Sequence, residues 1–427
     1  MIKKIITTSF VLGVMLGFHQ HAQALQWSDW QGSLEAAYGA RFSDDQTKHD
    51  EFNMLEARAQ LKTTHYFSGD HYLADKGGLL NFKGDFLLDG YFDGKTAFEL
   101  RELNLGFTPW DIIDVKLGRQ VFTWGTGDYL FINDMFPKDY RSFFIGREDE
   151  YLKKPSDAIK VSVFPEFGNV DMIVMAFEPN ATAKGDRLSF YDPFQGGLTG
   201  LSSDRELLEP PLQGSNLEYA LRFYRNIGSH EAAFYYFRGF DKNPTSYKNE
   251  LDRQLFYRRL DVYGASLRGP FLKGIGNAEA GYARSREDSE GTNRLIENSS
   301  FKALAGYTQD LGHDWKISFQ YQFEQRLDYA DYQANLMPTD LVFDQYRHLI
   351  TQRVTKQMLN QTLLLSLFNF YSPSDHDGYV RPSVSYDIND QWEATADGNF
   401  PWGEDDNTEF GMMKRNKNVF LRIRYTF

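Results

Sequence analysis

Hydrophobic and polar residues alternate along many short segments of this chain. In the clearest one, aromatic and aliphatic residues occupy the odd positions from Trp315 to Phe323, and polar residues occupy the even positions from Lys316 to Arg326. A period of two places successive side chains on opposite faces of a β-strand. Segments of this kind begin near Ser33, Met54, Leu79, Thr96, Ile112, Ala158, Val170, Leu217, Ala232, Leu255, Ala278, Phe301, Trp315, Leu363, Tyr379, Gln391 and Val419. The pattern therefore predicts an all-β protein.

The alternation continues to the last residue. The apolar face of this final segment consists of Val419, Leu421, Ile423, Tyr425 and Phe427. An apolar end of this kind frays in water, whereas a closed membrane barrel fixes it by pairing it with the first strand. The segment resembles the C-terminal signature of bacterial outer-membrane barrels. We expect it to pair with the strand near Ser33, and we expect Ile423, Tyr425 and Phe427 to form the signal that the barrel-assembly machinery reads.

Alternation alone also fits a soluble β-sandwich, which buries one face of each strand. The connections favour a barrel, because short turns such as 165–168 and 311–314 alternate with long polar segments such as 125–156 and 179–214. Short periplasmic turns and long extracellular loops are typical of outer-membrane barrels. The tryptophans are also expected at strand ends or turns, as interfacial girdles require. They are Trp27, Trp30, Trp110, Trp124, Trp315, Trp392 and Trp402.

The strand count follows from parity. Both ends of a single-chain barrel lie on one side of the membrane, so the number of strands should be even, and the clear segments number seventeen. The weakly alternating segment from Asp344 to Met358 supplies one more. We predict a transmembrane antiparallel β-barrel of eighteen strands, with sixteen as the alternative if short segments belong to loops.

The first residues have the pattern of a secretory leader. Lys3 and Lys4 precede an apolar run, and Ala22-Gln23-Ala24 supplies the small residues of a cleavage site. We therefore expect residues 1–24 to be a signal peptide and residues 25–427 to form a single barrel domain of the bacterial outer membrane. The chain has no cysteine and is 16% aromatic, and its net charge of -13 argues against nucleic-acid binding.

In the segment from Val115 to Gly146, the motif Gly118-Arg119-Gln120 is followed by Trp124-Gly125. This segment, together with the layout of the last three predicted strands, resembles porin-like outer-membrane barrels of the alginate-export family and related uncharacterised porin-like families. The resemblance implies a barrel of about eighteen strands. It implies no substrate, because no alginate-binding pattern can be carried over residue by residue.

The polar faces of the strands are expected to line an aqueous lumen. Thirteen basic residues fall on them: Arg41, Arg58, Lys62, Lys83, Lys116, Lys160, Arg222, Lys302, Lys316, Arg326, Arg381, Arg422 and Arg424. Eight acids share these faces: Glu35, Glu56, Asp85, Asp89, Asp171, Glu218, Glu279 and Glu324. A cationic lumen favours anionic solutes. The alternative is that these charges pair across neighbouring strands and only stiffen the wall.

The connection from 125 to 156 is too aromatic for a solvated loop. Its charged residues include Asp128, Asp134, Lys138, Asp139, Arg141 and Arg147. We expect it to fold into the lumen as a constriction, and the alternative is an external cap that contacts lipopolysaccharide or a neighbouring subunit. Arg119 breaks the alternation of its strand, so that either a bulge turns it inward, beside this loop, or it lies above the membrane. We include Arg119 among the expected pore-lining residues.

These expectations describe an outer-membrane channel for the passive passage of small solutes, with a preference for anions. The alternatives are a substrate-specific exporter or importer of a polysaccharide or hydrophobic compound, and a structural barrel around a periplasmic electron-transfer partner. The chain has no GxSxG, HExxH or GxxxxGK[ST] motif and no histidine pair with ligand spacing. We therefore expect no enzyme, metal or cofactor. The expected partners are outer-membrane lipid, lipopolysaccharide, the assembly machinery and a small solute.

Overall fold

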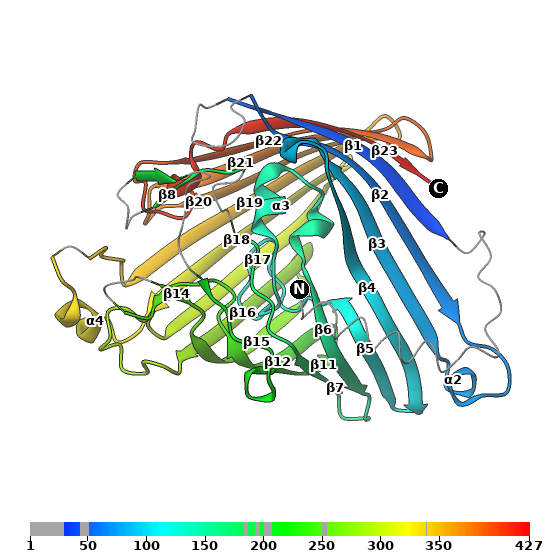
Figure 1. The fold of residues 1–427 in the computed structure, drawn as a ribbon, viewed down its shortest axis with the longest axis horizontal. Helices are drawn as coiled ribbons and strands as arrows, with labels where there is room; N and C mark the ends of the chain where they lie inside the picture. Colours follow the sequence, from blue (N-terminus) through cyan, green and yellow to red (C-terminus); the bar gives the residue numbers. More distant parts are fainter. Residues whose placement is uncertain are drawn as a thin grey trace.

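The chain forms one closed antiparallel β-barrel of eighteen strands (Figure 1). The computed structural model describes residues 30–42, 51–182, 187–192, 197–199, 207–249, 254–338 and 340–427. The barrel strands are β1 (Gln31–Arg41), β2 (Phe52–Tyr66), β3 (Leu79–Asp89), β4 (Lys95–Trp110), β5 (Ile113–Val121), β6 (Pro155–Val163), β7 (Asn169–Met175), β11 (Glu218–Ile227), β12 (His230–Phe240), β15 (Arg259–Phe271), β16 (Gly274–Ser285), β17 (Ser300–Gly312), β18 (Trp315–Arg326), β19 (Tyr346–Met358), β20 (Leu363–Ser372), β21 (Asp377–Asp387), β22 (Trp392–Gly403) and β23 (Asn418–Thr426). The predicted leader and Trp27 lie outside the described residues.

The last strand closes the barrel on the first. β23 pairs with β1 from Ser33 opposite Thr426 to Arg41 opposite Asn418. The two backbone hydrogen bonds between Gly32 and Phe427, at 2.9 and 3.0 Å, extend this pairing to the final residue. The predicted closure is confirmed, and so is the count of eighteen, because the weakly alternating segment from Asp344 to Met358 contains β19.

The connections differ in length at the two ends of the barrel. At one end, called here the short-turn rim, most strands are joined by tight turns, such as residues 228–229 between β11 and β12. At the other end, the long-loop rim, the connections include residues 122–154, 176–217 and 241–258. The small elements are α2 (Tyr72–Asp75), η2 (Gly90–Phe92), α3 (Tyr140–Ile145), η3 (Asp149–Leu152), β8 (Phe190–Asp192), β9 (Gly197–Thr199), β10 (Leu207–Leu208), η4 (Gly214–Asn216), β13 (Ser246–Tyr247), β14 (Leu255–Phe256), α4 (Tyr329–Asn335) and η5 (Gly411–Met413). The predicted asymmetry of the connections is therefore present.

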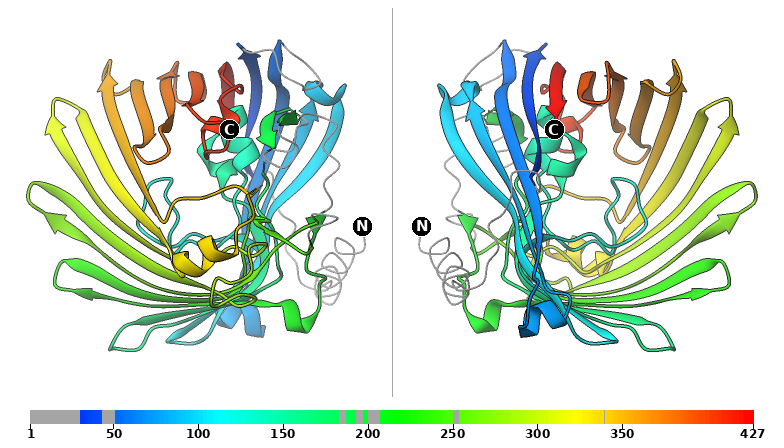
Figure 2. Two further views of the ribbon diagram at one scale, coloured as in Figure 1. Left: turned by 90° about the vertical axis from the view of Figure 1, so that its left-hand side faces the viewer. Right: turned by 90° about the vertical axis from the view of Figure 1, so that its right-hand side faces the viewer.

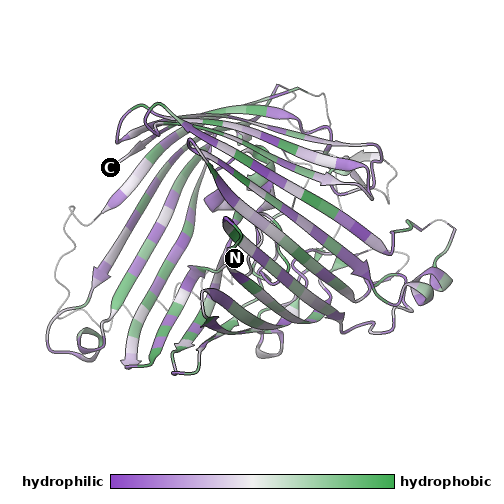
Figure 3. Cartoon of the chain, turned by 180° about the vertical axis from the view of Figure 1, so that it is seen from behind, coloured by the Kyte–Doolittle hydropathy of each residue, from purple (hydrophilic) through white to green (hydrophobic). Residues whose placement is uncertain are grey.

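The strands bury polar residues inside and expose apolar residues outside. Leu55 and Phe86 are exposed on the outer surface, whereas Glu56, Arg58 and Asp85 are buried on the inner one. Figure 3 shows alternating hydrophobic and hydrophilic bands along the strands that face the viewer. This distribution is the reverse of a soluble core, in which charged side chains are rarely buried. No helix in the described part of the chain is long and apolar enough to cross a membrane.

Most tryptophans lie at strand ends. Trp110, Trp315 and Trp392 mark the short-turn rim and Trp402 lies near the long-loop rim. Trp124 is different, because its ring centroid lies 5.0 Å from that of Phe136 and 5.8 Å from that of the buried Tyr235. The prediction that every tryptophan belongs to a girdle is therefore wrong for Trp124, whose side chain lies in the interior.

Candidate functional site

A long connection folds back into the barrel. Residues 122–154, which follow β5 and contain α3 and η3, form what is called here the inserted loop. Both side views place α3 within the ring of strands (Figure 2). Asp139 begins α3 by accepting a 2.9 Å hydrogen bond from the backbone N–H of Ser142, which is a standard N-cap. Gly146 ends the helix in the left-handed conformation.

Aromatic side chains hold one part of the loop against the wall. The ring of Tyr129 lies 4.8 Å from that of Phe368 on β20, and the ring of Phe143 lies 5.6 Å from that of Tyr379 on β21. These rings belong to a buried apolar cluster inside the barrel. Such edge-to-face pairs stabilise by more than their buried area alone. The aromatic content that marked this connection in the sequence is thus used for packing on the inner wall.

Three consecutive acids of the loop each contact a basic residue of the wall. Glu148 pairs with Arg424 and lies 3.4 Å from Arg422. Asp149 lies 3.4 Å from Arg381 on β21, and Glu150 lies 2.7 Å from Lys83 on β3. These wall residues are Lys83, Arg381, Arg422 and Arg424, all expected to line the lumen. Their charge is therefore largely neutralised by the loop rather than presented to a solute.

A second group of contacts attaches the loop to β2. Arg147 donates two hydrogen bonds to Glu56, at 2.7 and 2.9 Å, in a bidentate pair. The guanidinium of Arg58 lies 4.2 Å from the ring centre of Tyr151 and donates a 2.9 Å hydrogen bond to Asp85. This side of the wall and the loop form one buried ionic network.

The loop also reaches the opposite wall. Glu279 on β16 accepts hydrogen bonds from the backbone N–H groups of Thr126 and Asn133, at 2.6 and 2.8 Å. Asp128 lies 2.9 Å from Arg353 on β19. Because contacts occur on both sides of the barrel, the loop crosses the lumen and narrows it.

The remaining charged residues of the loop act mainly within it. Asp134 accepts a 2.8 Å hydrogen bond from the buried ammonium group of Lys138, which also lies 4.6 Å from the ring centre of Phe131. The backbone N–H of Arg141 donates to the carbonyl of Ala181, at 3.1 Å, in the next long connection. Of the six charged residues expected in the constriction, Asp128 and Arg147 contact the wall, whereas Asp134, Lys138 and Asp139 shape the loop.

The other expected lumen residues fall into two groups. Arg222 pairs with Glu231 at 2.7 Å, and Arg326 lies over the rings of Tyr332 and Phe343. Lys62 and Lys316 are exposed toward the short-turn half of the lumen, on the same faces as Lys83 and Gln320. Neither lysine forms an ion pair with any residue that the structure describes.

Arg119 lies on the outward face and not in the lumen. It pairs across the sheet with Leu103 and Asp157, on the same side as the exposed Ile159. Its guanidinium forms two 2.8 Å hydrogen bonds with the Asp157 carboxylate. The inward placement was wrong because no bulge reverses the strand here: Gly118, at φ +116°, lets the Leu103 carbonyl approach closely without changing the parity of Arg119. Arg119 is therefore not a lumen-lining residue.

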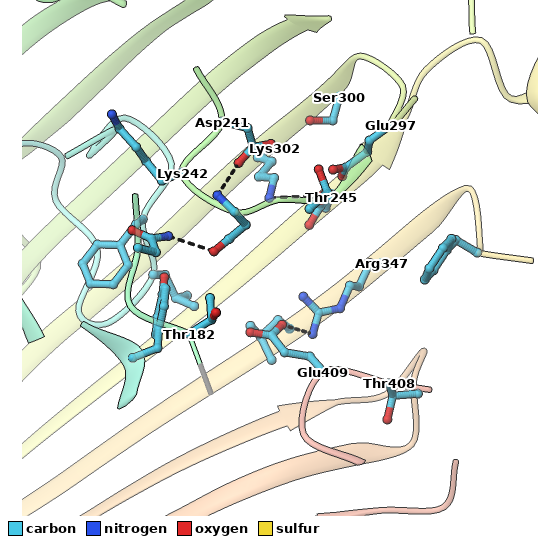
Figure 4. A pocket seen from close by; sticks show the side chains of 18 of the residues that line it. Thr182, Asp241, Lys242, Thr245, Glu297, Ser300, Lys302, Arg347, Thr408 and Glu409 are labelled. Atoms are coloured by element: carbon cyan, nitrogen blue, oxygen red, sulfur yellow. Dashed lines mark hydrogen bonds and ion pairs between the residues drawn. The ribbon is translucent and has the colours of Figure 1, made fainter. Parts of the chain in front are cut away.

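A chamber of about 1260 Å³ lies between the inserted loop and the wall, toward the long-loop rim. Arg347 of β19 and Glu409 of the β22–β23 connection point toward one another across it, at 2.7 Å (Figure 4). Its basic lining residues are Lys138, Lys242, Arg258, Lys302, Arg326 and Arg347. Its acidic ones are Asp134, Asp241, Glu297, Glu324, Asp344, Asp375, Asp405 and Glu409. With six basic residues against eight acids, the chamber does not share the cationic excess predicted for the wall.

The surroundings of two loop carboxylates shift their pKa values in opposite directions. Burial raises the pKa of Glu150, but hydrogen bonds from Lys83 and Gln60 outweigh it and hold the pKa at about 2. Burial raises the pKa of Asp128, and Arg353 only partly compensates. Glu150 is therefore the more firmly ionised of the two, and it is the stronger electrostatic attachment of the loop.

Several residues of this network were not identified from the sequence. Arg187, in the connection between β7 and β11, forms ion pairs with Glu56, at 3.0 Å, and with Asp89. Arg353 lies on β19, whose alternation is weak, so its inward direction could not be assigned. Among the described residues, no group of three or more His, Cys, Asp or Glu is arranged to hold a metal ion.

Comparison with known proteins relates this chain to other structures by fold. No protein-family model matches it, and no curated protein matches it. OccAB3 of Acinetobacter baumannii superimposes with a TM-score of 0.55 at 9% identity, over 94% of this chain and 99% of that one. OccK11 (OpdR) of Pseudomonas aeruginosa gives 0.54 at 9% identity, over 93% and 95%. OccK8 (OprE) of the same organism gives 0.51 at 12% identity, over 94% and 98%.

The likeness shows that this chain shares the β-barrel fold of these structures. At such low identity the likeness concerns the fold alone. The similarity of the segment from Val115 to Gly146 to the alginate-export family stays a prediction.

Proposed function

We propose that the protein is an outer-membrane channel through which small solutes pass passively, along a lumen narrowed by the inserted loop. The observation that carries this proposal is that charged strand residues are buried, whereas their apolar neighbours are exposed. Leu421 is 62% exposed on the outer surface of β23, whereas its neighbour Arg422 is 8% exposed on the inner one. A continuous apolar outer surface around a polar interior is stable in a bilayer and not in water.

A preference for anions rests on the few cations that the protein leaves unpaired. Lys62, Lys116 and Lys316 lie on inward faces in the short-turn half of the barrel. Within the described residues none of the three has an ion-pair partner. Cations that line a pore raise the local concentration of anions and ease their passage. These lysines, and not the arginines attached to the loop, are the proposed source of selectivity.

The test is the reversal potential of single channels in planar bilayers under a salt gradient. The wild-type protein should give stable ohmic steps with a preference for chloride over potassium. Replacing Lys62, Lys116 and Lys316 together by glutamate should abolish or reverse that preference, because three positive charges become negative. The matched control is Lys273→Glu, in the exposed turn between β15 and β16, which should leave it unchanged. Unaltered selectivity in the triple variant would remove the proposed source.

A second function, a route for aromatic or hydrophobic compounds, is favoured by the lining of the chamber. Ten aromatic residues line it: Tyr129, Phe131, Phe136, Tyr140, Phe143, Phe144, Phe190, Phe343, Phe370 and Phe410. Liposome swelling separates the two functions. A passive pore admits aromatic and aliphatic solutes of equal size at similar rates, whereas an aromatic-selective route admits the aromatic solute faster at low concentration and saturates.

A further inference from the structure

Four arginines gather on the outward face of three adjacent strands, near the long-loop rim. Arg238 lies on β12, Arg259 on β15 and Arg284 on β16, and Arg286 follows β16 directly. These strands are neighbours in the sheet (Figure 1). In register, Arg238 and Arg284 lie on either side of Asp261. The backbone N–H of Arg286 donates to the carbonyl of Arg259, at 3.0 Å. We call this group of four arginines the arginine patch.

The protein neutralises this patch only in part. Asp261 is the acid within it, and its carboxylate lies 3.7 Å from Arg238 and 3.8 Å from Arg286, beyond hydrogen-bonding distance. Glu287 lies beside it and accepts a 2.7 Å hydrogen bond from the backbone of Arg259. Four positive charges therefore face two negative ones. The side chain of Arg284 forms neither a hydrogen bond nor an ion pair with any described residue.

The guanidinium groups are also accessible from outside. The side chain of Arg238 is 48% exposed and that of Arg286 is 30% exposed, whereas that of Asp261 is only 10% exposed. Both arginine side chains are therefore more accessible from outside than the acid that they flank. An anion that approaches from outside meets the donors first.

A row of tyrosines lies next to the patch on the side of the barrel centre. Tyr236, Tyr263 and Tyr282 are cross-strand neighbours, with ring centroids 5.2 and 6.4 Å apart. Aromatic rings with a polar end prefer the boundary between the acyl chains and the headgroups of a bilayer. Arg238 comes two residues after Tyr236 on β12, and Arg284 comes two residues after Tyr282 on β16. Both strands run toward the long-loop rim, so the arginines lie closer to that rim than the tyrosines do. In a membrane the patch would lie at the level of the headgroups.

Charged residues are sparse elsewhere on the outward faces of the described strands. Arg119 and Asp157 form the bidentate pair described above, and the isolated Arg225 and Lys356 lie near the short-turn rim. Charges on a lipid-facing surface destabilise a barrel unless they lie at the interface. The arginine patch is concentrated at the level of the headgroups, where four guanidinium groups suit an anionic ligand.

We propose that the arginine patch is a binding site for the phosphate groups of a glycolipid headgroup in the leaflet on the long-loop side. The inference rests on the proposed location in the outer membrane. The planar guanidinium fork donates two parallel hydrogen bonds to a phosphate, and clusters of basic residues at a membrane surface recognise anionic headgroups. A lipid fits better than free phosphate, because the adjacent tyrosine rings offer an apolar surface to the part of the molecule that enters the membrane.

The test uses the full-length folded barrel in detergent and measures its dissociation constant for diphosphoryl lipid A. The variant Arg238→Gln/Arg284→Gln/Arg286→Gln should bind about a hundredfold more weakly, at about fivefold per arginine. Arg225→Gln, an outward arginine near the short-turn rim, is the matched control and should bind like wild type. The corresponding triple lysine variant keeps the charge without the fork and should bind with intermediate affinity. Retention of the heat-modifiable barrel form on gels shows that each variant is folded.

Three outcomes would overturn the inference. Equal affinity of the triple glutamine variant and wild type would exclude the patch. Equal binding of a dephosphorylated lipid A would exclude phosphate recognition, and full competition by millimolar inorganic phosphate would assign the site to free phosphate. Single-channel recording separates this inference from the proposed function. A barrel that binds lipid A but never conducts would contradict the proposed channel function and support the lipid site. A barrel that conducts but does not bind lipid A would contradict only the lipid site.

Discussion

The ammonium group of Lys83 on β3 lies 2.7 Å from the carboxylate of Glu150 in the inserted loop. The two residues are 67 positions apart in the chain. Their contact shows how the barrel uses the basic residues of its wall: Lys83, Arg381, Arg422 and Arg424 each meet an acid of the segment from Glu148 to Glu150. The loop supplies the counter-charges of these four basic residues when it folds in.

The attachment through Glu150 should weaken only in strong acid. The pKa of this carboxyl is about 2 in the docked loop and 4.5 ordinarily. A depressed pKa stabilises the docked loop above the ordinary value, and this stabilisation is lost as the pH falls from 4.5 toward about 2. Single-channel noise should therefore stay constant between about pH 7 and about pH 5 and rise below that range.

Glu150→Gln provides the comparison for this prediction. The variant lacks the titrating group, so its loop should already be looser at neutral pH, and its noise should change less on acidification. Asp331→Asn, in the exposed helix α4, should behave like wild type. Noise that rises in wild type well above pH 4.5 would mean that another group, such as Asp128, controls the loop.

Gly146 should be required for docking. Its φ is +94°, and a Cβ atom there would lie 2.2 Å from the ring of the buried Phe420 on β23. Gly146→Ala should destabilise the docked loop by about 1 to 3 kcal/mol, from backbone strain and overlap together. Limited trypsin digestion of the folded barrel would detect this as faster cleavage after Arg147 or Lys153.

The control for Gly146 is Gly214→Ala, because a Cβ atom at Gly214 meets nothing within 4 Å. This variant should be cleaved at the wild-type rate. If Gly146→Ala is equally resistant, then α3 is free to shift by the required distance, and the close approach to Phe420 is not what holds the loop.

Arg119 should contribute to stability and not to selectivity. Arg119→Ala would leave Asp157 charged and unpaired on the outward face, at a cost of about 1 kcal/mol near the interface. The double variant with Asp157→Ala should recover part of that loss, as a double-mutant cycle in lipid vesicles would measure. The reversal potential should stay that of wild type in both variants. A shifted reversal potential would return Arg119 to the conduction path.

The accuracy of the sequence-based predictions depended on how local each feature is. The strands were predictable because alternation is encoded by adjacent residues, and even β19, whose weak pattern hid Arg353, was found through parity. Contacts of the inserted loop were not predictable, because Lys83 and Glu150 share no local pattern. For Arg119, the alternation of the strand correctly placed the side chain on the same face as its apolar neighbours. The inward assignment was wrong because it assumed a bulge that β5 does not contain.

Removal of Phe427 should impair assembly of the barrel. Its backbone N–H and C=O both pair with Gly32, at 3.0 and 2.9 Å, and its ring lies 6.2 Å from that of Tyr425. Deletion of this residue removes the last closing hydrogen bonds and the final aromatic group, so β23 should register with β1 less efficiently. Phe427→Leu keeps both backbone bonds and loses only the ring, and it separates closure from recognition of the aromatic signal. The measurement is the fraction of heat-modifiable barrel in the membrane. If only the deletion lowers this fraction, the role of Phe427 is to close the barrel. If both variants lower it, the aromatic ring is required. Normal assembly of both variants would contradict an assembly role for Phe427.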